Sequence, residues 1–585
     1  MLGYQNKVLR IDLAKKSTST EPLNMEWAAK YIGGKGLGIR YMYDELKPGI
    51  DPLSAENKLM LMTGPLTGTP VPLSGKLAII SKSPASGTIL DCSIGGHAAI
   101  QIKYAGYDAV IFENKLEQPG YIVIEDDKID FVDAGELWGQ GSHEAETALV
   151  DKYGHHYTVL SIGPAGENLV PISCINSDFY RQAGRGGIGA VMGSKNLKAI
   201  LIKGSGGVKV NDIMNTTKRL QEILREDTTS EDNIWAFTDG TGGFVDACNE
   251  GGILPKRNFS DATDADTALY NTDALKANRA GKKACGSCGL GCGNFTKIGN
   301  AVCEGPEYES IAVAGPNCGI NDLEAIVKFN QICDNMGIDT ISAGDILAYA
   351  MEMTEKGIHD FGIKFGDKEK YLEYLVLMAK KEGVGAELAM GVKPLSEKYG
   401  GTDFAMHVKG LEYPQYEPRG SWGTALAYAV SDRGACHMRA YPPAEEVYAG
   451  SIPPYTAEGK GELVYNLSIY NAVKFSLVFC DFWALSLERM AEIMTMVTGK
   501  EFKEAEMNEI ALRVMNIARA FNQREGFDRS HDTVPKRIVN EALKSGPAAG
   551  QKIPQEDFEK MLTEFYEMCG WTEDGKVKEE VLATL

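Results

Sequence analysis

The sequence has no long apolar run and few cysteines for its length, which argues against a membrane protein and against a disulfide-rich secreted protein. Its most apolar stretch, residues 475–487, is interrupted by Asp481, and its first seven residues lack the apolar core of a secretory signal. We therefore expect a cytoplasmic protein without a membrane span. Only 12 cysteines occur among 585 residues, which indicates reduced thiols rather than a disulfide framework.

The composition is that of an ordinary globular protein with an excess of acidic residues. Hydrophobic residues make up 44% and charged residues 24% of the chain, and the net charge is −20. The acidic balance argues against nucleic acid as a partner. It also means that an acidic electron carrier would need a local basic patch, and the sequence does not reveal where such a patch lies.

The chain divides into two regions of different pattern. Within residues 1–208, short apolar or alternating runs bounded by glycine and proline predict strands at 8–13, 58–62, 78–81 and 109–112. Helical periodicity then appears at 211–226, 323–336, 342–356, 368–382, 462–479 and 504–521. The pattern predicts an α+β fold and disfavours a doubly wound sheet, with a β-rich domain over 1–208 and mostly helical domains over 209–412 and 413–585.

Three cysteines, Cys285, Cys288 and Cys292, lie in a loop of small residues, and Cys480 lies almost two hundred residues further on. Three local thiolates and one remote thiolate are typical of an iron–sulfur cluster, and glycine allows the loop to wrap tightly around a bulky group. A zinc site or a set of buried thiols stays open as an alternative. The spacing favours the cluster, and therefore electron transfer.

A second segment, residues 181–198, holds two arginines, two lysines and five glycines. Glycine lets backbone N–H groups approach an anion, and arginine binds phosphate with two parallel hydrogen bonds, so the segment favours a phosphate site. It does not fit the G-x-G-x-x-G fingerprint, and a structural glycine-rich turn is the alternative.

Two further segments are ambiguous when considered alone. Residues 334–342 read as a joint between two helices, with Gly337 as C-cap and Thr340 or Ser342 as N-cap. In residues 433–439, His437 lies among glycine and arginine and is a candidate acid–base group, although a lone histidine is more often structural.

These segments together resemble the aldehyde ferredoxin oxidoreductase family of tungsten enzymes over the full length. The matching motifs are residues 64–69, 185–200, 305–309, 535–537 and 570–576. The resemblance implies one tungsten (sometimes molybdenum) between two pterin dithiolenes, a neighbouring [4Fe–4S] cluster, and Mg²⁺ bridging the pterin phosphates. It also implies that the β-rich domain forms a base for this bis-pterin cofactor and that the two helical domains cover it.

The resemblance also assigns roles to individual residues. It gives the cluster to the four cysteines named above. It implies cofactor-binding positions at Lys76, Ser93, Gly95, Arg181, Gln182, Gly184, Asp334, Ile338, Asp339, Arg439 and Phe479.

The resemblance implies that Glu309 and His437 are the catalytic pair for oxidation of an aldehyde to a carboxylic acid. His437 would hydrogen-bond the carbonyl oxygen, and Glu309 would activate water or accept the released proton. Electrons would pass from tungsten through the cluster to ferredoxin or a ferredoxin-like subunit. A homodimer, a hetero-oligomer and a monomer all stay open.

The sequence departs from the family at the second pterin segment. There the family reads Asp-x-x-Gly-Leu-Cys, whereas this chain has Phe475 and Val478 in place of the Asp and the Gly and keeps Cys480. Lys474 and Asp481 are nearby but out of register. Smaller departures are Ser93 for Asn, Lys76 for Arg, and Arg439 for Lys.

Two other functions are compatible with the same motifs. Related aryl-CoA ring reductases carry a Cys ligand in place of the active-site Glu, and the retained Glu309 favours aldehyde chemistry. Cys318 is nine residues out of register and is expected to be a pocket or core residue. The third reading is a non-catalytic, metal-binding relative. The particular aldehyde, and tungsten against molybdenum, are not specified by the sequence.

Overall fold

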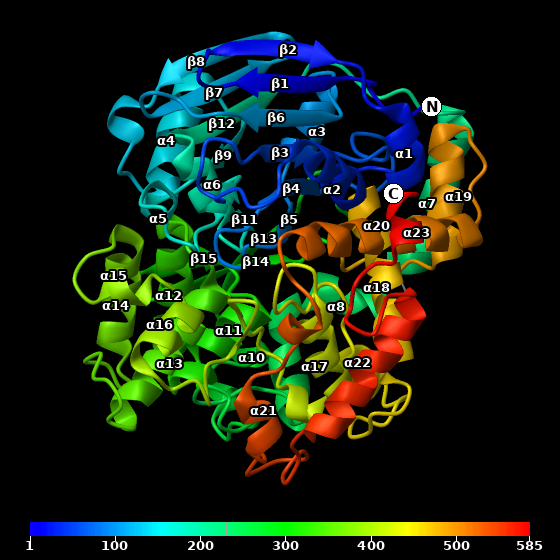
Figure 1. Cartoon of the computed structure of the whole chain (residues 1–585). Coiled ribbons are helices and arrows are strands. Elements are labelled where there is room, and N and C mark those ends of the chain that lie inside the picture. The colour runs from blue at the N-terminus through cyan, green and yellow to red at the C-terminus, as the bar shows by residue number, and fades with distance from the viewer. Residues whose placement is uncertain (229–230) are drawn as a thin grey trace.

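Two six-stranded sheets fill the amino-terminal region of the computed structural model, which describes residues 1–228 and 231–585 (Figure 1). Their strand orders are β2-β1-β6-β3-β4-β5 and β11-β10-β9-β12-β7-β8. The strands are β1 (Val8–Asp12), β2 (Ser17–Glu21), β3 (Leu59–Met62), β4 (Leu77–Lys82), β5 (Ile89–Ile94), β6 (Ala109–Glu113), β7 (Gly120–Glu125), β8 (Lys128–Asp133), β9 (Thr158–Ser161), β10 (Ile175–Ser177), β11 (Arg181–Ala183) and β12 (Leu197–Lys203). The four predicted strands are confirmed as β1, β3, β4 and β6.

Alternation along the strands divides the first sheet between two hydrophobic cores. Met60 and Ile80 pack in the core shared with the carboxy-terminal helices, whereas their neighbours Leu61 and Ile79 pack in the core between the two sheets. Successive side chains of a strand point to opposite faces, so both faces of this sheet are covered and the strands are buried throughout.

Helices cover the sheets and form the rest of the molecule, below the sheets in Figure 1. Those before residue 209 are α1 (Met25–Tyr31), α2 (Gly34–Glu45), α3 (Ala98–Tyr104), α4 (Ser142–Tyr153), α5 (Pro164–Glu167) and α6 (Ile188–Ser194). The middle region has α7 (Ile213–Thr228), α8 (Glu231–Thr238), α9 (Phe244–Glu250), α10 (Thr272–Ala277), α11 (Tyr308–Ala314), α12 (Leu323–Met336), α13 (Thr340–Glu355), α14 (Lys368–Lys380), α15 (Gly385–Leu388) and α16 (Val392–Tyr399). The last region has α17 (Trp422–Val430), α18 (Lys460–Leu477), α19 (Leu487–Thr498), α20 (Glu504–Arg524), α21 (Lys536–Asn540), α22 (Gln555–Cys569) and α23 (Glu579–Leu582).

The six predicted helices are confirmed as α7, α12, α13, α14, α18 and α20, with ends that differ by a few residues. A three-stranded sheet of β13 (Arg279–Lys283), β14 (Gly293–Ile298) and β15 (Ala301–Glu304), and the short pair β16 (His407–Val408) and β17 (Leu411–Glu412), lie among the helices. No helix in the described ranges has both the length and the apolar character needed to cross a bilayer.

The joint between α12 and α13 is capped differently from the sequence-based expectation. Gly337 is the left-handed C-cap of α12, as expected, with φ of 73°. The N-cap of α13 is Asp339, whose carboxylate accepts a hydrogen bond from the Ile341 N–H at 3.1 Å. The expected caps Thr340 and Ser342 are therefore wrong, because an Asp one position earlier reaches the free amide first.

The carboxy-terminal helices are packed into the amino-terminal region rather than standing apart from it. Helices α18 and α20 share a hydrophobic core with α2 and the first sheet. Gly34 at the start of α2 has φ of +40°, and a Cβ there would overlap the carbonyl oxygen of Phe475. This close approach holds the end of α18, and the segment that follows it to Cys480, against the amino-terminal region.

Candidate active site

A cavity of about 470 Å³ lies where the two sheets meet the helices. Its wall is formed by β5, β11, the cysteine loop, α11, the α12–α13 joint and residues around 437 and 480. Fifteen of the seventeen residues predicted for the site line this wall, namely Lys76, Ser93, Gly95, Arg181, Gln182, Gly184, Cys285, Cys288, Cys292, Glu309, Asp334, Ile338, Asp339, His437 and Cys480. The fold brings together residues that are up to about four hundred positions apart in the sequence.

Arg439 and Phe479 do not line this cavity. Arg439 borders a separate small pocket behind the wall, and Phe479 is fully buried, with its ring centroid 5.4 Å from that of Trp483 in an edge-on contact. Phe479 is thus a core residue in this structure, placed next to Cys480 along the chain.

A backbone clamp brings Cys480 to the three-cysteine loop. The Leu73 N–H donates to the Ser287 carbonyl, and the Leu73 carbonyl accepts from the Cys480 N–H, each at 2.8 Å. On the other side of the loop, a Cβ at Gly95 would lie 2.6 Å from Cys285 Sγ, so only glycine leaves room there. All four cysteines are half-buried. Their sulfurs line the wall without converging on one point, and within the described ranges no three His, Cys, Asp or Glu side chains are close enough to share one ion.

Charged side chains with unpaired atoms face the cavity near the cysteines. Arg181 Nη2 lies 2.6 Å from Glu304 Oε1 without hydrogen-bond alignment, and Arg181 Nε and Glu304 Oε2 are buried without a partner. Burial raises the pKa of Glu304 to about 7, although Arg181 opposes this rise. Asp481 Oδ1 is likewise unpaired, and its Oδ2 lies 3.8 Å from Lys76 Nζ. Unpaired buried polar atoms are costly, and they fit a wall built for a hydrogen-bonding ligand such as a pterin.

At the α12–α13 joint, Asp334 is the carboxylate that receives amide groups. Gln182 Nε2 donates to Asp334 Oδ1 at 2.7 Å, and Asn330 Nδ2 donates to Oδ2 at 3.0 Å. Burial raises the pKa of Asp334 well above its usual range, and the neighbouring Glu304 adds to the rise. Asp339, by contrast, already serves as the N-cap and accepts from Arg185 Nε at 3.2 Å.

The basic residues of the glycine-rich segment serve different ends. Arg185 is buried and donates to the carbonyls of Ala435 (2.7 Å) and Glu412 (2.6 Å), so it ties the β-rich region to the loop that carries His437. Lys195 and Lys198 are also buried and donate to backbone carbonyls. Only Arg181 faces the cavity. The segment is therefore mainly a structural joint that presents one arginine to the cavity.

Glu309 and His437 meet at one end of the cavity. His437 Nδ1 lies 3.3 Å from Glu309 Oε1, and Glu309 Oε2 accepts from the Gln415 N–H at 2.8 Å. Burial raises the pKa of Glu309 to about 8. Burial and the positive charge of Arg185 lower the pKa of His437 to about 3. At pH 7 the pair is therefore mostly a protonated carboxyl group beside a neutral imidazole, and the carboxylate form of Glu309 that could accept a proton becomes the major form above pH 8.

An aromatic wall next to this pair was not foreseen from the sequence. The Tyr416 ring stacks on Tyr308 with centroids 4.8 Å apart, and it lies 5.7 Å from the His437 ring and 5.0 Å from Tyr441. These residues line the cavity. Tyr308 lies within the 305–309 motif, whereas Tyr416 and Tyr441 lie outside every motif and periodic pattern used to predict the site.

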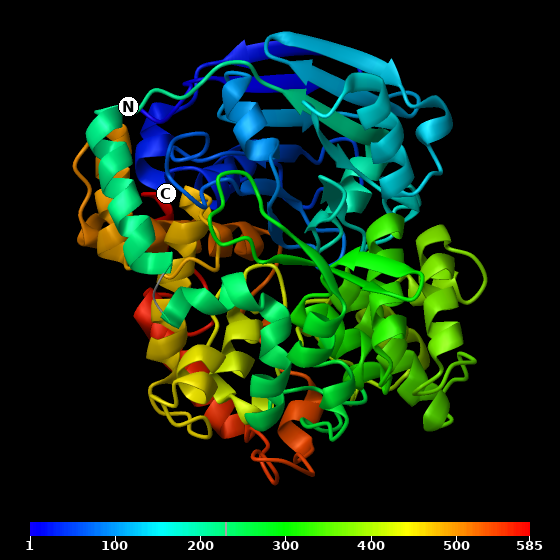
Figure 2. The ribbon, with the colours of Figure 1, turned by 180° about the vertical axis from the view of Figure 1, so that it is seen from behind.

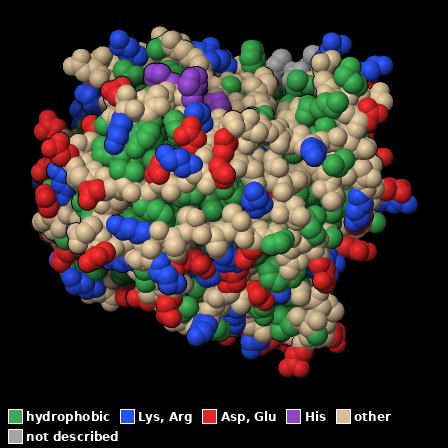
Figure 3. Space-filling model, turned by 90° about the horizontal axis from the view of Figure 1, so that it is seen from above, with side chains coloured by type: hydrophobic (Ala, Val, Ile, Leu, Met, Phe, Trp, Pro, Cys, Tyr) green, Lys and Arg blue, Asp and Glu red, His purple; other side chains and the backbone are tan. Residues whose placement is uncertain are grey.

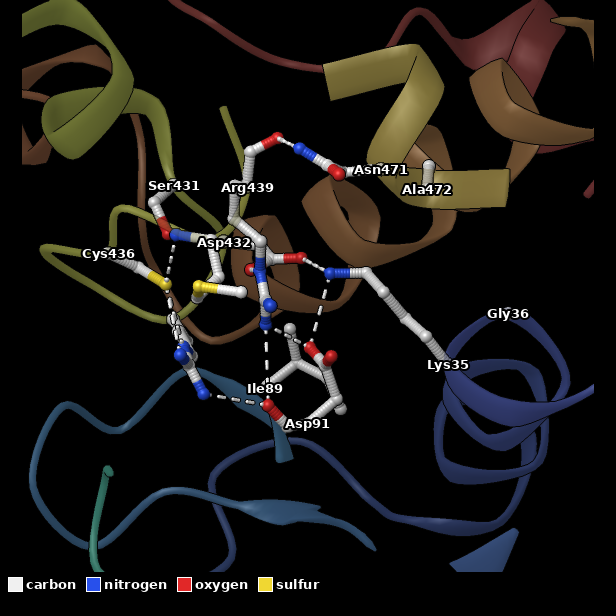
Figure 4. A network of polar contacts seen from close by, with 12 residues as sticks. Lys35, Gly36, Ile89, Asp91, Ser431, Asp432, Cys436, Arg439, Asn471 and Ala472 are labelled. Atoms are coloured by element: carbon white, nitrogen blue, oxygen red, sulfur yellow. Dashed lines mark hydrogen bonds and ion pairs between the residues drawn. The ribbon is translucent and has the colours of Figure 1, made fainter. Parts of the chain in front are cut away.

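The segment that departs from the family is backed by ion pairs (Figure 4). Asp91 and Asp432 both pair with Lys35 and with Arg439, and the Arg439 guanidinium lies 5.4 Å from the Phe475 ring centroid. The small pocket bordered by Arg439 and Phe475 lies here. Phe475 thus lies beside a network in which Lys35 and Arg439 are each paired with both Asp91 and Asp432.

Two residues near the departing segment have different surroundings. Lys474 is buried and donates to the backbone carbonyls of Asp481 (2.8 Å) and Trp483 (2.9 Å), away from the large cavity. Asp481, in contrast, lines that cavity. Cys318 is fully buried in the helical core, so it is a core residue.

Comparison with known proteins agrees with this architecture. Residues 8–204 match the family model for the aldehyde ferredoxin oxidoreductase N-terminal domain, and residues 215–585 match that for its domains 2 and 3. A tungsten-containing aldehyde ferredoxin oxidoreductase of Pyrococcus horikoshii is 37% identical over all of this chain and 99% of its own length. The WOR-like subunit of an aliphatic sulfonate oxidoreductase of Pyrococcus furiosus is 31% identical over all of this chain and 97% of its own length.

Among solved structures, the active-site complex BamBC of benzoyl coenzyme A reductase superposes with a TM-score of 0.85. It is 22% identical and covers 100% of this chain and 97% of its own, which shows a shared fold. The fold and these matches define the class of the chain, which is an oxidoreductase enzyme. The chain belongs to the aldehyde ferredoxin oxidoreductase family.

Proposed function

We propose that the chain oxidises aldehydes to carboxylic acids at a tungsten pterin cofactor and passes the electrons through a [4Fe–4S] cluster to ferredoxin or a ferredoxin-like subunit. The observation that carries this proposal is the neutral pair Glu309 and His437 at one end of a cavity that four cysteines line elsewhere. One cavity therefore holds acid–base groups for a carbonyl substrate together with ligands for an electron-transfer cluster.

The residues on the wall fit the proposed groups by their chemistry. Cys285, Cys288, Cys292 and Cys480 would hold the cluster, Arg181 would meet a pterin phosphate, and Asp334 with Gln182 would meet a pterin ring edge. Ser93, two residues before Gly95, would offer an oxygen ligand to Mg²⁺. When bound, the metal cofactor supplies the acceptor for two electrons, and the cluster relays them singly.

The chain's own residues would handle the protons. Aldehyde plus water yields a carboxylic acid, two protons and two electrons. His437 would donate a hydrogen bond to the aldehyde oxygen, and the Glu309 carboxylate would take a proton from the attacking water. The aromatic wall around Tyr416 would keep bulk water away and favour planar, apolar aldehydes.

Two further parts of the proposal concern the whole protein, namely its domain division and its location. The division at residues 208 and 412 and a cytoplasmic location are proposed as the sequence predicts them. An experiment to test the function is metal analysis of anaerobically purified protein for tungsten, molybdenum and iron, followed by an aldehyde panel with a viologen dye as acceptor. Protein that carries both cofactors but reduces no dye with any aldehyde would contradict the proposal.

A further inference from the structure

Strand β13 places three cations directly before the cysteine loop. It is the edge strand of the three-stranded sheet, and it carries Arg279, Lys282 and Lys283. Arg279 and Lys282 are exposed, and Lys283 is half-buried. The chain reaches Cys285 two residues after β13 ends. In Figure 2 this segment is the bright green trace that crosses the near side of the molecule.

In the part of the chain that the structure describes, these cations have no carboxylate as an ion-pair partner. Among the described residues, none of the three forms an ion pair; Arg279 Nη1 donates to the Thr238 carbonyl at 2.9 Å, and Lys283 Nζ donates to the Asp178 carbonyl at 2.6 Å. The carboxylates of Asp239 and Asp178 are themselves engaged, with Lys276 at 2.6 Å and His97 at 2.8 Å. On the face seen in Figure 3, by contrast, basic side chains lie interspersed with acidic ones.

The same surface has an apolar centre and an exposed part of the cysteine loop. Phe237 is 54% exposed, and the Lys282 ammonium lies 4.5 Å from its ring centroid. Ser287 and Gly289, on either side of Cys288, are exposed. Lys283 pairs with Gly293 in the register of β13 and β14, and Gly293 directly follows Cys292, so the cations and the cysteines are neighbours.

We propose that β13, Phe237 and the cysteine loop form the docking surface for a small acidic redox protein of the ferredoxin type. The inference rests on the proposed function, since it names where the electron acceptor binds. A local positive surface on a chain of net charge −20 selects an acidic partner and steers its approach to the cluster. A second copy of this chain would present the same cations, which repel each other.

The test uses the cofactor-loaded protein with Arg279→Glu and Lys282→Glu combined, and Lys552→Glu as the matched control. Lys552 is exposed and lies between α21 and α22. Aldehyde oxidation is measured with a purified acidic [4Fe–4S] ferredoxin and, separately, with viologen dye. We expect kcat/KM for the ferredoxin to fall about tenfold or more in the double variant and to lose most of its dependence on ionic strength, because electrostatic steering is worth ~10–10³ in association rate. The dye rate and the control variant should be unchanged.

Each other outcome has a distinct meaning. An unchanged ferredoxin kcat/KM with normal dye activity would overturn the docking surface. A change in oligomeric state of the double variant by size-exclusion chromatography, with ferredoxin turnover unchanged, would overturn it in favour of a second copy. If no aldehyde reduces the dye, the proposed function fails, and calorimetric titration of the same ferredoxin into wild type and variants still decides the surface. Lys282→Gln with normal iron content guards against misfolding of the double variant.

Discussion

The wall of the large cavity near the cysteines and the wall of the small pocket beside Phe475 are built on different principles. The wall formed by Arg181, Gln182 and Asp334 keeps buried polar atoms without partners or with only amide partners. The wall near Phe475 has an aromatic ring where the family has a carboxylate, and the charges behind it, Arg439 among them, are already paired with each other. A bound ligand could supply hydrogen-bond partners for the first wall, whereas the charged groups behind Phe475 already pair with one another.

This difference shows how the fold around position 475 can be retained although a carboxylate of the family is replaced there by Phe475. A lone buried charge is unfavourable, so the loss of a carboxylate at position 475 leaves Arg439 dependent on other carboxylates. Asp91 and Asp432 meet that need and hold α2, β5 and the His437 loop together. The comparison therefore predicts that mutations at the first wall change chemistry or cofactor content, and that mutations at the second change stability.

The largest effect on activity is expected at Glu309, which meets His437 at one end of the large cavity. Glu309→Gln keeps the shape but cannot accept a proton, so turnover should fall about 10²–10⁴-fold, the usual contribution of a general base. Dye-linked aldehyde oxidation gives the rate, and metal analysis gives the control, since tungsten and iron content should stay as in wild type. Near-normal turnover would remove Glu309 from the mechanism.

Asp432→Asn should mainly destabilise the fold. It removes one charge from a buried network with Lys35 and Arg439, and breaking a buried pair costs about 3–5 kcal/mol. We expect a lower thermal unfolding temperature in cofactor-loaded and cofactor-free protein alike. If only the loaded form were destabilised, the network would belong to the cofactor and the contrast between the walls would fail.

The pH profile tests the catalytic pair without mutation. The pKa of Glu309 is raised to about 8 by burial, so the carboxylate that accepts a proton is the minor form at pH 7 and becomes the major form above pH 8. The value of kcat/KM for an aldehyde should rise about tenfold per pH unit below pH 8 and level off above it. Glu309→Gln should abolish this rise; a flat wild-type profile from pH 6 to 9 would contradict the assignment.

The smallest effect on stability is expected for Asp334→Asn, the first-wall counterpart of Asp432→Asn. Burial raises the pKa of Asp334 and so disfavours its charged form, and replacement by an uncharged amide of the same shape should change the free energy of unfolding by no more than about 1 kcal/mol. Pterin content after acid extraction should nevertheless fall, because the amide alters the donor pattern offered to the ring. Equal pterin content in both proteins would show that Asp334 is structural.

Much of the site could be predicted from the sequence, but the side chains that surround the predicted residues could not. The cysteine spacing and the basic glycine-rich segment are local patterns with specific chemistry, and together with the family resemblance they pointed to fifteen residues that line the cavity. The aromatic wall was not predicted, since Tyr308 begins α11 whereas Tyr416 and Tyr441 come from two distant loops, and only the fold brings the three rings together. The N-cap of α13 was misjudged because three adjacent residues could all serve.

The sequence by itself determined the class of the fold, the family and the cysteine ligands proposed for the cluster, because strand alternation, helical periodicity and ligand spacing are local properties of a chain. Only the tertiary structure decided which arginine of the glycine-rich segment faces the cavity, that Leu73 clamps Cys480 to the cysteine loop, and that unpaired cations stand beside that loop. These outcomes depend on which distant groups become neighbours, and burial and pairing then determine whether a charge is consumed by the fold or left for a ligand.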